Sequence, residues 1–137
     1  MNEGYARWYA PLAVACVVLS FQPLLPADEY GTLWEMAGRG SGNPAAMGAV
    51  LMTVLILLLG YASFRPAVSR WVPAAIAVLS GVIAVMLLTR PGTGADRPEL
   101  TSFGDAAVAV AICACVLGGS QFAGLGRRSG GARTMAP

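Results

Sequence analysis

The sequence contains no histidine and no lysine, and it has little charge of either sign. Charged residues make up 12% of the chain, whereas soluble domains average about 25%. Because histidine is the commonest metal ligand and general base, its absence excludes haem bound by two histidines and removes the usual base of a serine protease. Nine arginines against seven acids form no basic patch, so the composition also excludes a nucleic-acid binder.

The three cysteines show no pattern of redox or metal chemistry. Cys16, Cys113 and Cys115 all lie in apolar stretches. Cys113 and Cys115 are two positions apart, so on a helix their side chains point about 200° apart and cannot bind one metal ion. We interpret all three as small apolar side chains of a core. The sequence therefore predicts no metal, no cofactor and no catalytic residue.

Apolar sequence is what the chain has in excess. Residues of the AVILMFWYC class make up 56% of it, and they gather in four blocks. A helix of about 20 residues is roughly 30 Å long, which is the thickness of a bilayer's hydrocarbon core. The predicted spanning helices cover about residues 8–25, 45–64, 71–89 and 105–125.

These blocks predict an all-α protein, an integral membrane four-helix bundle. Residues 1–125 form its single domain, and residues 126–137 are expected to be a disordered cytoplasmic tail. Asp105 is the expected N-cap of the last span. A cleaved signal peptide is the alternative for the first block, but Leu25-Pro26-Ala27 matches a cleavage site poorly, so we expect a retained helix.

The distribution of arginine predicts that both termini are cytoplasmic. With the N-terminus inside, six arginines fall in inner segments and three in outer loops, and every acid except Glu3 is outside. Arginine without lysine, together with abundant alanine and glycine, is typical of a GC-rich bacterial genome. We therefore predict a multi-pass, N-in/C-in protein of a bacterial inner membrane. The inner arginines are Arg7, Arg65, Arg70, Arg127, Arg128 and Arg133.

The first outer loop contains the one distinctive segment outside the spans. Its apolar residues fall on one face of a short helix over residues 28–37, which we expect to lie flat on the outer surface with Trp34 as an interfacial anchor. A simple cap over the bundle is the alternative. The outer acids form a surface that could attract a cationic partner or an ion, although topology alone would also place acids outside. They are Asp28, Glu29, Glu35, Asp96 and Glu99.

The fourth span has a row of small residues, each four positions after the last. Close packing of small side chains drives the association of helices in membranes. Two interpretations stay open: this face holds the four helices together, or it docks a separate protein. The row consists of Ala107, Ala111, Cys115, Gly119 and Ala123.

These patterns favour a non-catalytic accessory or scaffold subunit of a larger bacterial membrane complex, with other membrane subunits and lipids as partners. A small homo-oligomeric channel or facilitator is the alternative. A metal-dependent membrane enzyme using the outer carboxylates is a third hypothesis, although no metal-ligand spacing supports it. A channel would require four polar residues to converge on a pore, namely Thr53, Ser80, Ser120 and Gln121.

Overall fold

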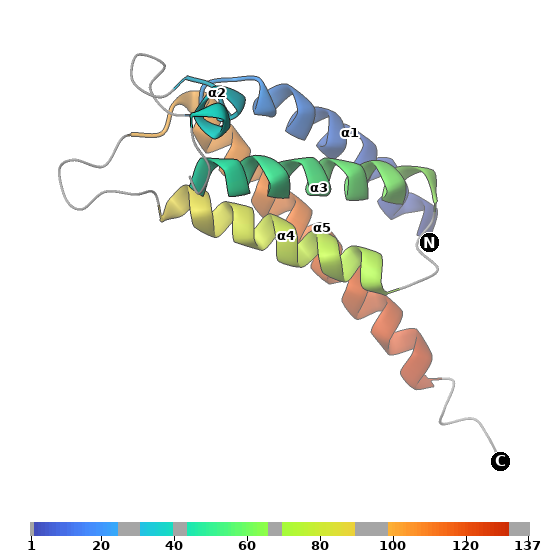
Figure 1. The fold of residues 1–137 in the computed structure, drawn as a ribbon. Coiled ribbons are helices and arrows are strands. Elements are labelled where there is room, and N and C mark those ends of the chain that lie inside the picture. Colours follow the sequence, from blue (N-terminus) through green and yellow to red (C-terminus); the bar gives the residue numbers. More distant parts are fainter. Residues whose placement is uncertain (1, 25–30, 40–43, 66–69, 90–98, 132–137) are drawn as a thin grey trace.

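The computed structural model describes residues 2–24, 31–39, 44–65, 70–89 and 99–131, and all regular structure in these ranges is helical (Figure 1). This confirms the all-helical prediction. Three helices, α3, α4 and α5, are long and apolar enough to cross a membrane, and α1 contains a shorter apolar stretch, Arg7–Ser20. The helices are α1 (Asn2–Ser20), α2 (Leu33–Gly38), α3 (Pro44–Phe64), α4 (Trp71–Leu88) and α5 (Ser102–Gly131).

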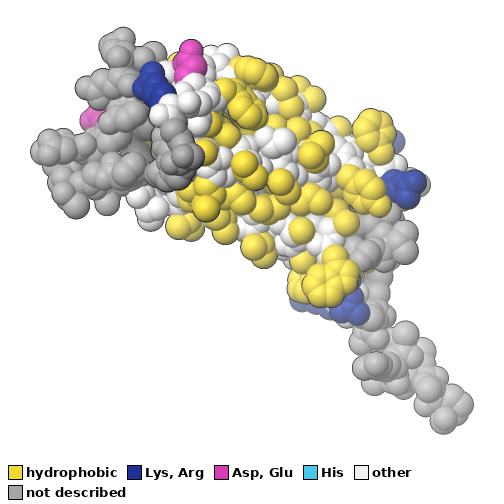
Figure 2. Space-filling model, viewed as in Figure 1, with side chains coloured by type: hydrophobic (Ala, Val, Ile, Leu, Met, Phe, Trp, Pro, Cys, Tyr) yellow, Lys and Arg dark blue, Asp and Glu magenta, His cyan; other side chains and the backbone are white. Residues whose placement is uncertain are grey.

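The four longer helices lie side by side as a bundle. α1 packs against α3 and α5, α4 packs against the same two helices, and the α4–α5 pair is the most extensive. The start of α1, the end of α3, the start of α4 and the end of α5 lie at one end, which we call the basic end; α2 lies at the opposite end (Figure 1). Hydrophobic side chains cover the middle of the face seen in Figure 2, and charged side chains lie toward its two ends.

The buried faces of α4 and α5 follow alternating steps of three and four residues. This spacing averages 3.5 residues, the period at which two helices stay in contact while crossing at about 20°. On α5 almost every buried position is glycine or alanine, so its backbone comes close to its neighbours. The residues that follow this spacing are Pro73, Ile76, Ser80 and Ile83 on α4, where Ala84 is buried as well, and Gly104, Ala107, Ala111, Ala114, Gly118 and Gln121 on α5.

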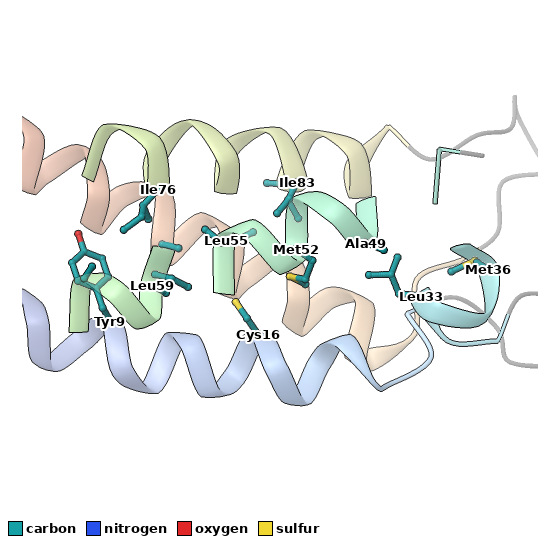
Figure 3. Packing of buried hydrophobic residues seen from close by; sticks show 14 residues of the cluster. Tyr9, Cys16, Leu33, Met36, Ala49, Met52, Leu55, Leu59, Ile76 and Ile83 are labelled. Carbon is teal, nitrogen blue, oxygen red and sulfur yellow. The ribbon is translucent and has the colours of Figure 1, made fainter. Parts of the chain in front are cut away.

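The large side chains of the core come mainly from α3 and α4. Leu55, Leu59 and Ile76 are fully buried, and Figure 3 shows them between the helices together with Tyr9 and Cys16 of α1. The buried residues that α5 adds to this cluster are the small Ala111 and Ala114, and Val110 and Leu117 pack against it only partly buried. The core is therefore built from bulky side chains on one side and the close backbone of α5 on the other.

α1 differs from the predicted first span at both ends. It begins at Asn2 instead of near residue 8, and it ends at Ser20 instead of near residue 25. Its last turn tightens, because the N–H groups of Phe21 and Gln22 donate to carbonyls three residues back. Pro23 has no N–H with which to continue the helix.

α5 begins at Ser102 with Thr101 as its cap, so the predicted start at Asp105 is wrong by one turn. The Thr101 hydroxyl oxygen accepts a hydrogen bond from the Gly104 N–H at 3.2 Å and donates one to the Pro23 carbonyl at 2.6 Å. The Thr101 N–H also donates to the Leu24 carbonyl at 3.3 Å. Thr101 thus satisfies carbonyls at the end of α1 while it caps α5, which Asp105 in the first turn cannot do.

Replacing Thr101 with valine should destabilise the α2 end of the bundle. The variant loses the helix cap and leaves the Pro23 carbonyl without its hydroxyl donor, an expected loss of about 1–2 kcal/mol. Unfolding in mixed detergent micelles, followed by helical circular dichroism, measures this loss. Ser102→Ala, at an exposed neighbouring position, is the control. Equal stability of the two variants would contradict a stabilising role for the hydrogen bonds that join Thr101 to the segment after α1.

α5 also extends past the predicted end of the fourth span. It continues to Gly131, so residues 126–131, predicted as part of a disordered tail, are helical. Residues 132–137 lie outside the described residues. The final turns of α5 project beyond the other helices at the basic end (Figure 1).

Candidate functional site

The row of small residues predicted on α5 divides between the inside and the outside of the bundle. Ala107 and Ala111 are buried, and Cys115 is half-buried against α4, where its Sγ lies 3.7 Å from the place of a Cβ on Gly81. No neighbouring atom lies within 4 Å of the place of a Cβ on Gly119, and Ala123 is exposed. The cause is geometric: four residues overshoot one helical turn by about 40°, so a row of five winds around the helix.

α4 and α5 approach each other very closely at Gly118. A Cβ at this position would lie 2.7 Å from the Pro73 carbonyl oxygen, closer than real Cβ atoms approach other atoms, and 3.0 Å from the Ala77 nitrogen, which is also unusually tight. Only glycine fits there without a shift of one helix. Four-residue spacing alone leaves Gly118 and Ala114 out of the packing face; the alternation of three and four residues would have found both.

The outward side of α5 is a distinct surface, which we call the outer face of α5 and define as Ile112, Val116, Gly119 and Ala123. Ile112 and Val116 are 47% and 65% exposed, so they project from the bundle. Gly119 has no side chain and Ala123 has only a methyl group, so these two positions leave a notch in the helix surface. The surface therefore combines two β-branched side chains with a notch in the helix, which lies toward the projecting end of α5.

The polar residues considered for a pore do not converge within the chain. The hydroxyls of Thr53 and Ser120 are on exposed positions, and each donates to a carbonyl of its own helix, at 2.8 Å and 2.9 Å. The hydroxyl of the buried Ser80 donates to the Ile76 carbonyl at 2.6 Å. These three hydroxyls are bonded within their own helices, α3, α4 and α5.

Gln121 has a different role, because it connects two helices. The Tyr9 hydroxyl donates to Gln121 Oε1 at 2.5 Å, and both side chains are buried. Tyr9 points from α1 into the space between the helices (Figure 3). A buried amide in an apolar helix needs such a partner, but sequence analysis did not identify Tyr9 because its contact depends on how α1 and α5 align.

α2 occupies the second half of the range 28–37 over which one to three turns of helix were predicted, and residues 28–30 lie outside the described residues. It begins after Thr32, whose hydroxyl accepts a hydrogen bond from the Glu35 N–H at 3.3 Å, while the Glu35 carboxylate accepts one from the Thr32 N–H at 2.8 Å. This reciprocal capping box sets the start of the helix. Gly31 precedes it with a φ of 74°, a conformation that favours glycine.

One face of α2 packs on the bundle, and Trp34 lies beside it. Leu33 and Met36 are buried in the main core cluster, where α2 contacts α3. Trp34, the predicted interfacial anchor, is 41% exposed, and its ring centroid lies 6.3 Å from that of Phe21. α2 therefore covers the end of the bundle and leaves an aromatic pair near its surface.

The predicted acidic surface is described only in part. Asp28, Glu29 and Asp96 lie outside the described residues, whereas Glu35 and Glu99 are described and exposed. The Glu35 carboxylate takes part in the capping box. Within the described ranges, no three His, Cys, Asp or Glu side chains lie close enough together to hold a metal ion.

Acidification should loosen α2. Hydrogen bonds from the backbone and side chain of Thr32, and then the charge of Arg39, hold the pKa of Glu35 below its ordinary value. A lowered pKa means that the ionised carboxylate stabilises the folded state, and this contribution disappears as the pH falls through the folded-state pKa. In a protein with Trp8 and Trp71 changed to phenylalanine, the fluorescence of Trp34 should shift on acidification.

Glu35→Ala removes the side chain that closes the capping box and should show the loosened state of α2 already at neutral pH, with the same Trp34 fluorescence as the acidified parent. Glu99→Ala removes another exposed carboxylate and should leave the Trp34 spectrum unchanged. A Glu35→Ala spectrum identical to that of the parent across the titration would contradict the role given to the capping box.

Comparison with known proteins gives the chain no family. No protein-family model, no curated protein and no solved structure matches it. A function for the chain therefore rests on its own geometry.

Proposed function

We propose that the chain is an integral membrane protein with four spanning helices and that it is a non-catalytic accessory subunit of a larger complex in a bacterial inner membrane. The length and apolar character of α3, α4 and α5 support the membrane placement. α1 completes the bundle: its apolar stretch covers roughly 21 Å, and the exposed rings of Trp8 and Phe21 lie near its two ends, where interfacial aromatics are favoured.

The proposed orientation is N-in and C-in. Exposed arginines lie within or directly beside the ends of the helices at the basic end, and positively charged residues favour the cytoplasmic side. The exposed acids Glu35, Glu99 and Asp105 lie at the opposite end, in α2, just before α5 and in the first turn of α5. The basic end is therefore assigned to the cytoplasm. Its described arginines are Arg7, Arg65, Arg70 and Arg127.

The outer face of α5 carries the accessory-subunit proposal. Apolar burial does not drive helices together in lipid, so a membrane helix gains from a neighbour mainly through close packing. The notch at Gly119 and Ala123 admits the backbone of another helix, while Ile112 and Val116 beside it offer large contact area. The bundle itself uses the other side of α5, around Gly118, so the two seams are independent.

The alternative of a homo-oligomeric channel has less support. Its polar side chains are bonded to their own helices or, for Gln121, to Tyr9. Large apolar side chains such as Leu55 and Leu59 fill the centre of the bundle. A pore would therefore have to form between copies of the chain.

Site-specific photocrosslinking in living cells tests the proposal with two matched valines. Val116 on the outer face of α5 and Val78 on α4 are 65% and 66% exposed. A photoreactive residue at position 116 should form adducts with a different membrane protein, and the same residue at position 78 should not. Adducts of position 116 with a second copy of the chain would favour the homo-oligomer instead, and equal adduct patterns at both positions would contradict a docking face on α5.

A further inference from the structure

An exposed arginine lies close in sequence to an exposed aromatic side chain on every long helix at the basic end. Trp8, Phe64 and Trp71 are 64%, 89% and 83% exposed, and each directly adjoins an exposed arginine. On α5, Phe122 is 46% exposed and precedes Arg127 by little more than one turn. The pairs are Arg7 with Trp8, Arg65 with Phe64, Arg70 with Trp71 and Arg127 with Phe122.

Packing places these pairs at the same end of the bundle (Figure 1). Arg65 and Arg70 flank the connection from α3 to α4, and the Arg65 guanidinium lies 6.0 Å from the centroid of the Tyr61 ring. The buried hydrogen bond between Tyr9 and Gln121 joins α1 to α5 at the same end. Arg7 and Arg127 therefore lie on two helices that are held together near these residues. Glu3 is the one acid near these positions in the sequence, and its side chain lies outside the described residues.

We propose that the basic end binds the phosphate groups of anionic phospholipids in preference to zwitterionic ones, an inference that rests on the proposed membrane placement. A guanidinium donates two parallel hydrogen bonds to a phosphate. Four or more juxtamembrane cations form the kind of cluster that selects anionic headgroups. The neighbouring aromatic rings would lie among the upper acyl chains, an arrangement that fits a lipid and not a free anion.

Quenching of tryptophan fluorescence by brominated lipids measures this preference. Trp34→Phe leaves Trp8 and Trp71 as reporters, both at the basic end. The protein is reconstituted into vesicles that mix unlabelled phosphatidylcholine with either brominated phosphatidylglycerol or brominated phosphatidylcholine. The relative binding constant of the anionic lipid should be about fivefold or higher at low salt, and it should fall as salt screens the arginines.

Neutral glutamine variants identify the residues responsible. The quadruple variant R7Q/R65Q/R70Q/R127Q should lower the relative binding constant to about one, whereas Arg39→Gln, an exposed arginine beside α2, should leave it unchanged. Because all four positions are exposed, helical circular dichroism should match that of the parent. Arg65→Lys keeps the charge and provides a folded comparison in which only the bidentate geometry is lost.

Equal quenching of the parent protein by the two lipids, or full selectivity in the quadruple variant, would overturn lipid recognition by the basic end. Inorganic phosphate at constant ionic strength should not change the result; if it abolished selectivity, the site would bind a free anion and the lipid proposal would be wrong. Absence of quenching by either lipid would overturn the membrane placement as well.

Discussion

Replacing Gly118 with leucine should separate α4 from α5 and destabilise the bundle by about 3 kcal/mol or more. A Cβ at Gly118 meets the Pro73 carbonyl and the Ala77 nitrogen, so relief requires movement of a whole helix. Because α4–α5 is the most extensive helix pair, its loss should lower the stability of the entire bundle. The fraction of folded protein in mixed detergent micelles, titrated with a denaturing detergent, measures the effect.

Gly119→Leu is the matched control for this experiment. The two substitutions are identical and adjacent, but a Cβ at Gly119 meets no atom within 4 Å. The Gly119→Leu protein should therefore remain folded at detergent fractions that unfold the Gly118→Leu protein. Equal unfolding curves for the two variants would contradict the α4–α5 packing described above.

Gly119→Leu should instead release the partner subunits of the proposed complex. A leucine fills the notch of the outer face of α5, and a penalty of about 1.4 kcal/mol in a close-packed seam corresponds to about tenfold weaker association. Recovery of partner proteins with the affinity-tagged chain, quantified by mass spectrometry, measures this loss. The amount of the tagged chain itself in the membrane should not change.

Two further variants separate docking from folding. Val78→Leu changes an equally exposed side chain on α4 and should leave partner recovery unchanged. Ala111→Leu is unsuitable as a docking variant, because Ala111 is buried inside the bundle and its replacement would disturb α5 itself. Full recovery of partners with Gly119→Leu would contradict a docking role for this face.

The two central helices could be predicted closely from the sequence. The expected spans 45–64 and 71–89 nearly coincide with α3 and α4. Long apolar runs determine these helices, and Pro44 begins α3 where a missing N–H does not matter. Local signals sufficed here because helix length and composition set the boundaries.

The start of α5 could not be predicted in the same way, because a contact with the segment that follows α1 determines which residue caps the helix. Thr101 and Asp105 are both good caps in isolation. The hydrogen bond from Thr101 to the Pro23 carbonyl, 78 positions away in the sequence, decides between them. No local pattern contains that information.

The candidate site was partly visible in the sequence. Gly119 and Ala123 were identified as small, but four-residue spacing placed them on the same face as the buried Ala107 and Ala111. Because four residues overshoot one helical turn, a row at this spacing winds around the helix, and its last two members come to lie on a different side from the first two. The Tyr9–Gln121 hydrogen bond required the alignment of α1 against α5, which follows from packing and not from periodicity.

Extraction of native membranes into polymer nanodiscs, followed by native mass spectrometry, tests the accessory-subunit proposal most directly. We expect the 14.1 kDa chain to travel with larger membrane proteins in a fixed stoichiometry, and to lose them when Gly119 is replaced by leucine. A chain that is extracted alone, or only with copies of itself, would contradict the proposed function.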